Sequence, residues 1–92
     1  MKEKFEFITN AKSAEFCEGI VNRMISLFGI TIDEAIGRMN RDWKGLNLSD
    51  PNDVIFHEDE EYWANTIYYG KGSNWWLNPI GLKPRPYNGS LN

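Results

Sequence analysis

The sequence predicts a mainly α-helical protein of three helices, with an irregular, aromatic and proline-rich C-terminal tail and room for a short two-stranded β ribbon. Two observations carry this prediction: an apolar stripe with helical spacing in residues 11–28, and a helix-start pattern at Thr31. The chain has 92 residues, a length that suits a single domain over residues 1–92. Its hydrophobic content of 41% and charged content of 25% are ordinary for a globular protein.

The first helix is expected over residues 11–28, because its apolar residues recur at i, i+3, i+4, i+7, i+8 and i+11. They are Cys17, Ile20, Val21, Met24, Ile25 and Phe28. Asn10 or Ser13 can cap the start of this helix, and Gly29 can end it by taking the left-handed conformation.

The second helix is expected from Thr31 to about Asp42. Thr31 and Glu34 have the capping-box spacing, in which Thr31 caps the helix and Glu34 reaches back to it. The apolar face consists of Ile32, Ala35, Ile36, Met39 and Trp43. Only Gly29 and Ile30 separate the two helices, so we expect a tight helical corner. We expect Ile36 to be buried together with Ile20, Val21 and Met24.

The third helix is expected from His57 to about Tyr69, after a loop over residues 44–52. Acidic residues in its first turn complement the helix dipole. The segment Thr66–Tyr69 also has strand propensity, so its helical or extended state is left open. Alternating apolar residues at 3–9 suggest a strand, whose partner in a two-stranded ribbon would be residues 53–57.

Aromatic side chains are distributed unevenly along the chain. All four tryptophans and all four tyrosines lie from Trp43 onward. Such side chains anchor cores, protein interfaces and ligand grooves, and we expect most of these to be core. In an extended backbone Trp75 and Trp76 would point to opposite faces, so one is expected at the surface. The candidate partner- or ligand-binding residues are Tyr68, Tyr69, Trp75, Trp76, His57 and Glu61.

Charge is also segregated, around a mild net charge of −3. Residues 51–70 carry acids and no Lys or Arg, whereas residues 71–92 carry Lys71, Lys83 and Arg85 and no acid. Either the tail lies across the acidic segment, in its own chain or in a partner subunit, or the two are unrelated solvated segments.

Catalytic and metal-binding patterns are weak. His57 with Glu58 and Glu61 could serve a metal or act as a base, but catalytic zinc needs about three protein ligands. We therefore expect no catalytic residue, no metal and no cofactor. Cys17 is the only cysteine and lies on the apolar stripe, which indicates a structural thiol.

The favoured function is a small non-catalytic interaction or regulatory protein that presents an aromatic surface, with a protein partner or a homodimer as its assembly. The alternative is a small-molecule-binding or enzymatic domain that uses the acidic and aromatic second half. A helix-turn-helix DNA binder ranks third, because Ile25 is bulky at the helix approach and Asp33 and Glu34 would face phosphates. The sequence has neither an apolar leader nor a membrane span, so a cytoplasmic location is expected.

Five short segments are dominated by aromatic anchors and helix starts. They are Thr31-Ile32-Asp33-Glu34-Ala35-Ile36, Arg41-Asp42-Trp43, His57-Glu58, Tyr62-Trp63-Ala64 and Ile67-Tyr68-Tyr69-Gly70. Together with Pro86-Tyr87 they resemble a group of small bacterial proteins of unknown function, over about residues 30–87. The resemblance implies a bacterial, cytosolic origin and brings no activity with it.

Overall fold

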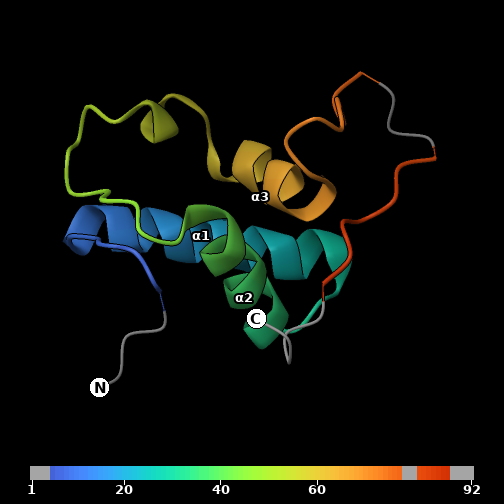
Figure 1. The fold of residues 1–92 in the computed structure, drawn as a ribbon, viewed down its shortest axis with the longest axis horizontal. Coiled ribbons are helices and arrows are strands. Elements are labelled where there is room, and N and C mark those ends of the chain that lie inside the picture. The colour runs from blue at the N-terminus through green and yellow to red at the C-terminus, as the bar shows by residue number, and fades with distance from the viewer. Residues whose placement is uncertain (1–4, 78–80, 88–92) are drawn as a thin grey trace.

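The computed structural model describes residues 5–77 and 81–87 of the chain, and these ranges contain three α-helices and one short 3-10 helix. The helices are α1 (Ala11–Phe28), α2 (Ile32–Trp43) and α3 (Glu60–Tyr69), with the 3-10 helix η1 (Val54–His57) before α3. Helix α1 packs against both α2 and α3, so it forms the centre of the fold (Figure 1). The mainly helical architecture expected from the sequence is confirmed.

Helix α1 begins and ends as its sequence predicts. Asn10 Oδ1 accepts from the Ser13 backbone N–H at 2.9 Å, and Ser13 Oγ accepts from the Asn10 N–H at 2.8 Å. Gly29 ends the helix with φ 68°, a left-handed conformation that its missing Cβ permits. The predicted stripe faces the core, where Ile20 and Met24 are fully buried.

Helix α2 differs from its prediction in two details. Thr31 Oγ1 accepts from the Glu34 N–H at 3.0 Å, but the Glu34 carboxylate pairs with Arg38 at 2.8 Å instead of reaching back to Thr31. The buried face is also rotated around the helix axis, toward Arg38 and away from Ile32 and Ile36. Ile36 is only half-buried, and Ile32 in the first turn is 52% exposed.

The predicted ribbon between residues 3–9 and 53–57 is wrong. Ile8 instead forms an isolated parallel bridge with Asn47, in which the Ile8 N–H donates to Leu46 O at 2.9 Å and the Leu48 N–H donates to Ile8 O at 2.8 Å. Asp53 Oδ1 accepts from the Ile55 N–H at 3.0 Å and starts η1. Such a local side-chain bond competes with strand pairing. Residues 3 and 4 lie outside the described ranges.

Helix α3 begins at Glu60, three residues later than expected. Asp59 is its N-cap and accepts from the Tyr62 N–H at 2.8 Å, which leaves His57 at the end of η1. The segment Thr66–Tyr69, whose state the sequence left open, is helical.

A chain of contacting aromatic rings crosses the fold. Successive rings have centroids 5.0 to 5.8 Å apart, within the range for favourable edge-to-face or offset contacts. In order of contact the rings are Phe5, Phe7, Trp43, Trp63, Tyr62, Trp75 and Trp76. The chain links the N-terminal segment to α2, α3 and the segment after α3. Phe5, Phe7 and Trp43 are buried in the core and Trp63 packs against it, whereas Trp76 is 52% exposed.

Residues 81–87 return across α2 and the end of α3 (Figure 1). The Arg85 N–H donates to Tyr68 O at 2.9 Å, and the Tyr87 hydroxyl lies directly against Gly37, where a Cβ would collide with it. The Arg85 side chain pairs with Asp42 of α2 at 2.7 Å, whereas Lys83 is exposed. This basic segment therefore lies on α2, and its described ion pairs do not include the acidic residues 53–61.

Candidate functional site

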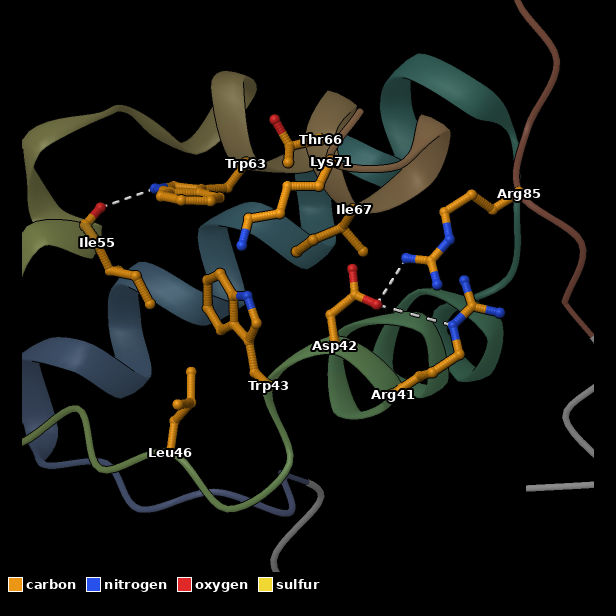
Figure 2. Close-up of a pocket in the computed structure, with 10 residues that line it drawn as sticks. All are labelled: Arg41, Asp42, Trp43, Leu46, Ile55, Trp63, Thr66, Ile67, Lys71 and Arg85. Atoms are coloured by element: carbon orange, nitrogen blue, oxygen red, sulfur yellow. Dashed lines mark hydrogen bonds and ion pairs between the residues drawn. The ribbon is translucent and has the colours of Figure 1, made fainter. Parts of the chain in front are cut away.

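A groove of about 690 Å³ lies between the end of α2, η1, α3 and residues 71 and 85 (Figure 2). Its volume is in the usual range of small-molecule sites, roughly 300–1,000 Å³. Arg41, Asp42, Trp43, Leu46, Ile55, Trp63, Thr66, Ile67, Lys71 and Arg85 line it. These residues separate into an apolar wall and a charged end.

We call Trp43, Leu46, Ile55, Trp63 and Ile67 the apolar wall. The indoles of Trp43 and Trp63 meet edge to face, with centroids 5.6 Å apart and planes at 80°. Trp63 Nε1 donates to Ile55 O at 2.7 Å, which fixes the Trp63 ring between α3 and η1. Trp43 is only 6% exposed, so its ring is held by the core behind it. The wall is thus shaped before any ligand arrives.

We call Arg41, Asp42 and Arg85 the charged end. Asp42 Oδ1 lies 2.7 Å from Arg85 Nη1 and 3.8 Å from Arg41 Nε. Two arginines therefore face a single carboxylate that Arg85 already pairs. This end of the groove is locally positive, although the whole chain carries a net charge of −3.

Arg41 is incompletely satisfied at the charged end. Its Nη1 donates to Pro86 O at 2.7 Å, but Nε and Nη2 are buried and have no hydrogen-bond acceptor among the described residues. Burial and the neighbouring Arg85 guanidinium lower the pKa of Arg41, partly offset by Asp42. A buried donor without an acceptor costs about 1–3 kcal/mol.

Lys71 follows the end of α3. Figure 2 shows its side chain extending toward the space between the Trp63 and Trp43 rings. It is exposed and makes no hydrogen bond or ion pair with the part of the chain that the structure describes. Thr66 is occupied differently, since its Oγ1 accepts from Trp75 Nε1 at 3.1 Å. The ammonium group of Lys71 therefore has no partner among the described residues and extends toward the apolar wall.

The groove offers few groups for acid–base or metal chemistry among the residues that line it. Its lining has no histidine or cysteine, and its one carboxylate is paired with arginine. No group of three or more His, Cys, Asp or Glu among the described residues could hold a metal ion. Cys17 lies in the core, where burial, with a smaller effect of Glu18, raises its pKa to about 12. It is therefore a protonated structural thiol at neutral pH.

The structure separates the predicted pair His57 and Glu61. His57 is exposed at the end of η1, while Glu61 lies in the first turn of α3 and pairs with Arg23 of α1 at 2.6 Å. The expected i, i+4 spacing on one helix does not form, because Asp59 caps α3 after His57. His57 and Glu61 therefore do not share a helix face.

Tyr68 and Tyr69 join helices instead of lining the groove. The Tyr68 ring stacks on Phe28 of α1, with centroids 3.7 Å apart and planes at 5°, and Tyr69 meets Phe28 edge to face at 5.4 Å. Tyr68 also contacts α2, where the Arg38 guanidinium lies 4.7 Å from the Tyr68 ring centroid. Both tyrosines are half-buried.

Trp75 and Trp76 differ in exposure, as expected, but their backbone is not extended. Their backbone is a turn, in which the Leu77 N–H donates to Asn74 O at 2.9 Å and Asn74 has φ 53°. Trp75 is half-buried against α3, whereas Trp76 is 52% exposed. The exposed indole stands outside the groove.

None of the six predicted site residues lines the groove. From the sequence we placed Trp43 on the apolar face of the second helix and expected most of the tryptophans and tyrosines to be core, and Arg41 was not among the candidate site residues. Two features of the sequence could have pointed to the groove. They are the basic residues on α2 next to Trp43, and Arg85 in a tail without acidic residues.

No family model, curated protein or solved structure matches the chain. No described helix has the length and apolar character needed to cross a membrane.

Proposed function

We propose that the chain is a non-catalytic, single-domain binding protein that holds a small organic ligand in the groove between α2 and α3. One observation carries this proposal: a preformed wall of two fixed indoles adjoins three cations, of which Arg41 has buried N–H groups without acceptors. Pockets that combine apolar walls with a few convergent polar groups are typical ligand sites.

The same lining argues against an enzyme. General acid–base catalysis needs a group that exchanges a proton near neutral pH, and the groove offers only arginines, a lysine and a paired aspartate. A role in DNA binding is equally poorly supported. Arg38, the first basic residue of α2, is 4% exposed and turned inward, so phosphates cannot reach it.

A thermal-shift screen with anionic, neutral and cationic aromatic compounds tests this function. Compounds that enter the groove should raise the melting temperature by mass action. Leu46→Trp fills the groove from a position that is 40% exposed, and should reduce those shifts. Val54→Trp, at a position 71% exposed and outside the lining, is the control. No shift at millimolar compound, or equal shifts in Leu46→Trp, would refute the proposal.

A second candidate function is association with a protein partner or a second copy of the chain. Trp76 and Leu77 are adjacent and 52% and 71% exposed, and tryptophan is a common interface anchor. Sedimentation at micromolar concentration should then show a dimer that Trp76→Ala dissociates. A strictly monomeric wild type would exclude self-association. The cytoplasmic location and bacterial origin stay predictions.

A further inference from the structure

We propose that the face of α2 beneath residues 85–87 is a peptide-recognition site, selective for an extended Arg-Pro-Tyr segment of a partner protein. Residues 85–87 of the chain have this sequence and occupy the site as an internal ligand. The site adjoins the groove but does not require a ligand there, so this inference goes beyond the proposed function. Three features carry it: a notch for the tyrosine ring, two donors for the peptide backbone and a carboxylate for the arginine.

Gly37 forms a notch for an aromatic ring in the middle of α2. Glycine is a poorer helix former than alanine, so helix formation does not explain its presence there. The Tyr87 hydroxyl lies where a Cβ on Gly37 would be. The guanidinium groups of Arg38 and Arg41 lie 5.4 and 5.7 Å from the centroid of the Tyr87 ring, within the range of cation–π attraction. The notch therefore suits an aromatic side chain in both shape and charge.

The same two arginines also hold the backbone of the segment. Arg38 Nη1 donates to Arg85 O at 2.9 Å, and Arg41 Nη1 donates to Pro86 O at 2.7 Å. The Arg85 N–H in turn donates to Tyr68 O at 2.9 Å. Pro86 has no N–H that would need an acceptor, and the residue before a proline favours extended backbone. These contacts therefore suit an extended segment with proline at its second position.

Asp42 supplies the carboxylate that pairs with the arginine of the segment. Its Oδ1 lies 2.7 Å from Arg85 Nη1, and the two side chains are 21% and 35% exposed. The aliphatic part of the Arg85 side chain lies against Gly70, where a Cβ would come within 2.9 Å of Arg85 Cδ. The end of α3 thus leaves room for this arginine, and the site recognises Arg, Pro and Tyr in order.

The internal segment can be replaced because it lies outside the core. The hydrophobic core formed by the described residues contains no residue of 81–87, and Lys83, Pro84 and Pro86 are exposed. Exchange of this segment between two copies of the chain would form the same contacts again, and these would not offset the cost of association. A segment of a partner protein that adds contacts of its own can displace the internal one.

Fluorescence anisotropy with a labelled, capped peptide of residues 81–87 tests the site in the whole 92-residue chain. Arg85→Ala/Tyr87→Ala weakens the internal ligand and leaves the residues of α2 unchanged. The peptide should bind this double variant at least about tenfold more tightly than wild type, because the internal segment competes at an effective concentration on the order of millimolar. Lys83→Ala changes an exposed side chain of the same segment and should bind like wild type. Absence of binding to the double variant at millimolar peptide would overturn the proposal.

Variant peptides test which residues the site recognises. Replacing the peptide tyrosine by alanine should weaken binding to the double variant about tenfold, since it removes two cation–π contacts. Replacing the peptide arginine by alanine should weaken it about threefold, as expected for a partly exposed ion pair. Equal binding of the three peptides would contradict selective recognition.

Substitutions in the double variant locate the peptide on α2. Gly37→Ala fills the notch and should weaken binding at least about tenfold. Gly72→Ala, where a Cβ meets nothing within 4 Å, is its control. Leu46→Trp fills the groove and should leave peptide affinity unchanged, so failure of the groove as a ligand site is distinguished from failure of the peptide site. Unchanged binding after Gly37→Ala would refute the site on α2.

A measurement on wild type provides the test if the double variant does not fold, which circular dichroism reports. Unlabelled peptide should displace the internal segment of ¹⁵N-labelled protein and shift the Arg85 amide signal saturably. An unchanged Arg85 signal at millimolar peptide would overturn the proposal. Sedimentation tests the occupant. A wild-type dimer that Arg85→Ala/Tyr87→Ala converts to monomer would assign the site to a second copy of the chain, and the partner protein would be wrong.

Discussion

Arg38 Nη1 donates to the backbone carbonyl oxygen of Arg85 at 2.9 Å, across 47 positions of the chain. Arg38 is 4% exposed, and it also pairs with Glu34 at 2.8 Å and donates to Tyr68 O at 3.4 Å. One buried side chain thus connects α2, the end of α3 and residues 81–87. This connection positions the Arg85 side chain at the groove.

Arg38→Met should destabilise the fold by about 1–3 kcal/mol, because Glu34 and two carbonyl oxygens lose their donor. Urea unfolding measures the change, and amide hydrogen exchange at Arg85 should accelerate as residues 81–87 loosen. Arg23→Met is the matched control. It breaks an ion pair whose side chains are 45% and 52% exposed, so its expected cost is below about 1 kcal/mol. Similar losses in both variants would contradict the role assigned to Arg38.

Ile20→Ala and Met24→Ala should each cost about 2–5 kcal/mol, because both side chains are fully buried in the stripe of α1. Ile32→Ala changes another isoleucine at a position 52% exposed and should cost much less. Chemical denaturation compares the three. An Ile20→Ala protein as stable as wild type would refute the packing of α1.

Cys17 should make stability fall as the pH rises above about 8.5. The unfolded thiol loses its proton near that pH, whereas the folded thiol keeps it until its raised pKa of about 12. The unfolded state then binds fewer protons than the native state, so its relative free energy falls by up to about 1.4 kcal/mol per pH unit over this window. Unfolding curves of wild type and Cys17→Ala, compared between pH 8 and 10, isolate this contribution. If the free energies of unfolding of wild type and Cys17→Ala change with pH in parallel, Cys17 does not make this contribution.

Gly37→Ala should displace residues 81–87 from α2, because the new Cβ would occupy the place of the Tyr87 hydroxyl. Alanine is intrinsically better than glycine within a helix by about 1 kcal/mol, so a loss of stability here would reflect the displaced contact. We also expect weaker binding of the compounds that the thermal-shift screen identifies, since Arg85 would shift with the segment. Gly72→Ala, which meets nothing within 4 Å, is the control. If Gly37→Ala binds ligand as tightly as wild type, residues 81–87 do not contribute to ligand binding in the groove.

The helices could be predicted because their signals are local. The stripe through Ile20 and Met24, the cap at Asn10 and the left-handed Gly29 are properties of neighbouring residues, and the structure shows all of them. The start of α3 was misplaced because Asp59 and the acids around it are all good first-turn residues. Only the bond from the Tyr62 N–H to Asp59 decides between them.

The groove could not be predicted, because it depends on contacts between distant residues. Arg85 reaches Asp42 only once residues 81–87 cross α2, and no local pattern specifies that crossing. Similarly, Ile8 pairs with Asn47 instead of residues 53–57, because Asp53 caps η1. Trp63 looked like a core anchor from its helix position alone, and it becomes a groove wall through its bond to Ile55 O.

The most direct test of the groove as a ligand site is a titration of ¹⁵N-labelled protein with the compound that gives the largest thermal shift in the screen, followed through the tryptophan indole N–H signals. We expect saturable shifts of the Trp43 and Trp63 signals, because these groups line the groove. The Trp76 signal should stay in place, since that indole lies outside the lining. Shifts confined to Trp76, or no shift at saturating probe, would contradict the account.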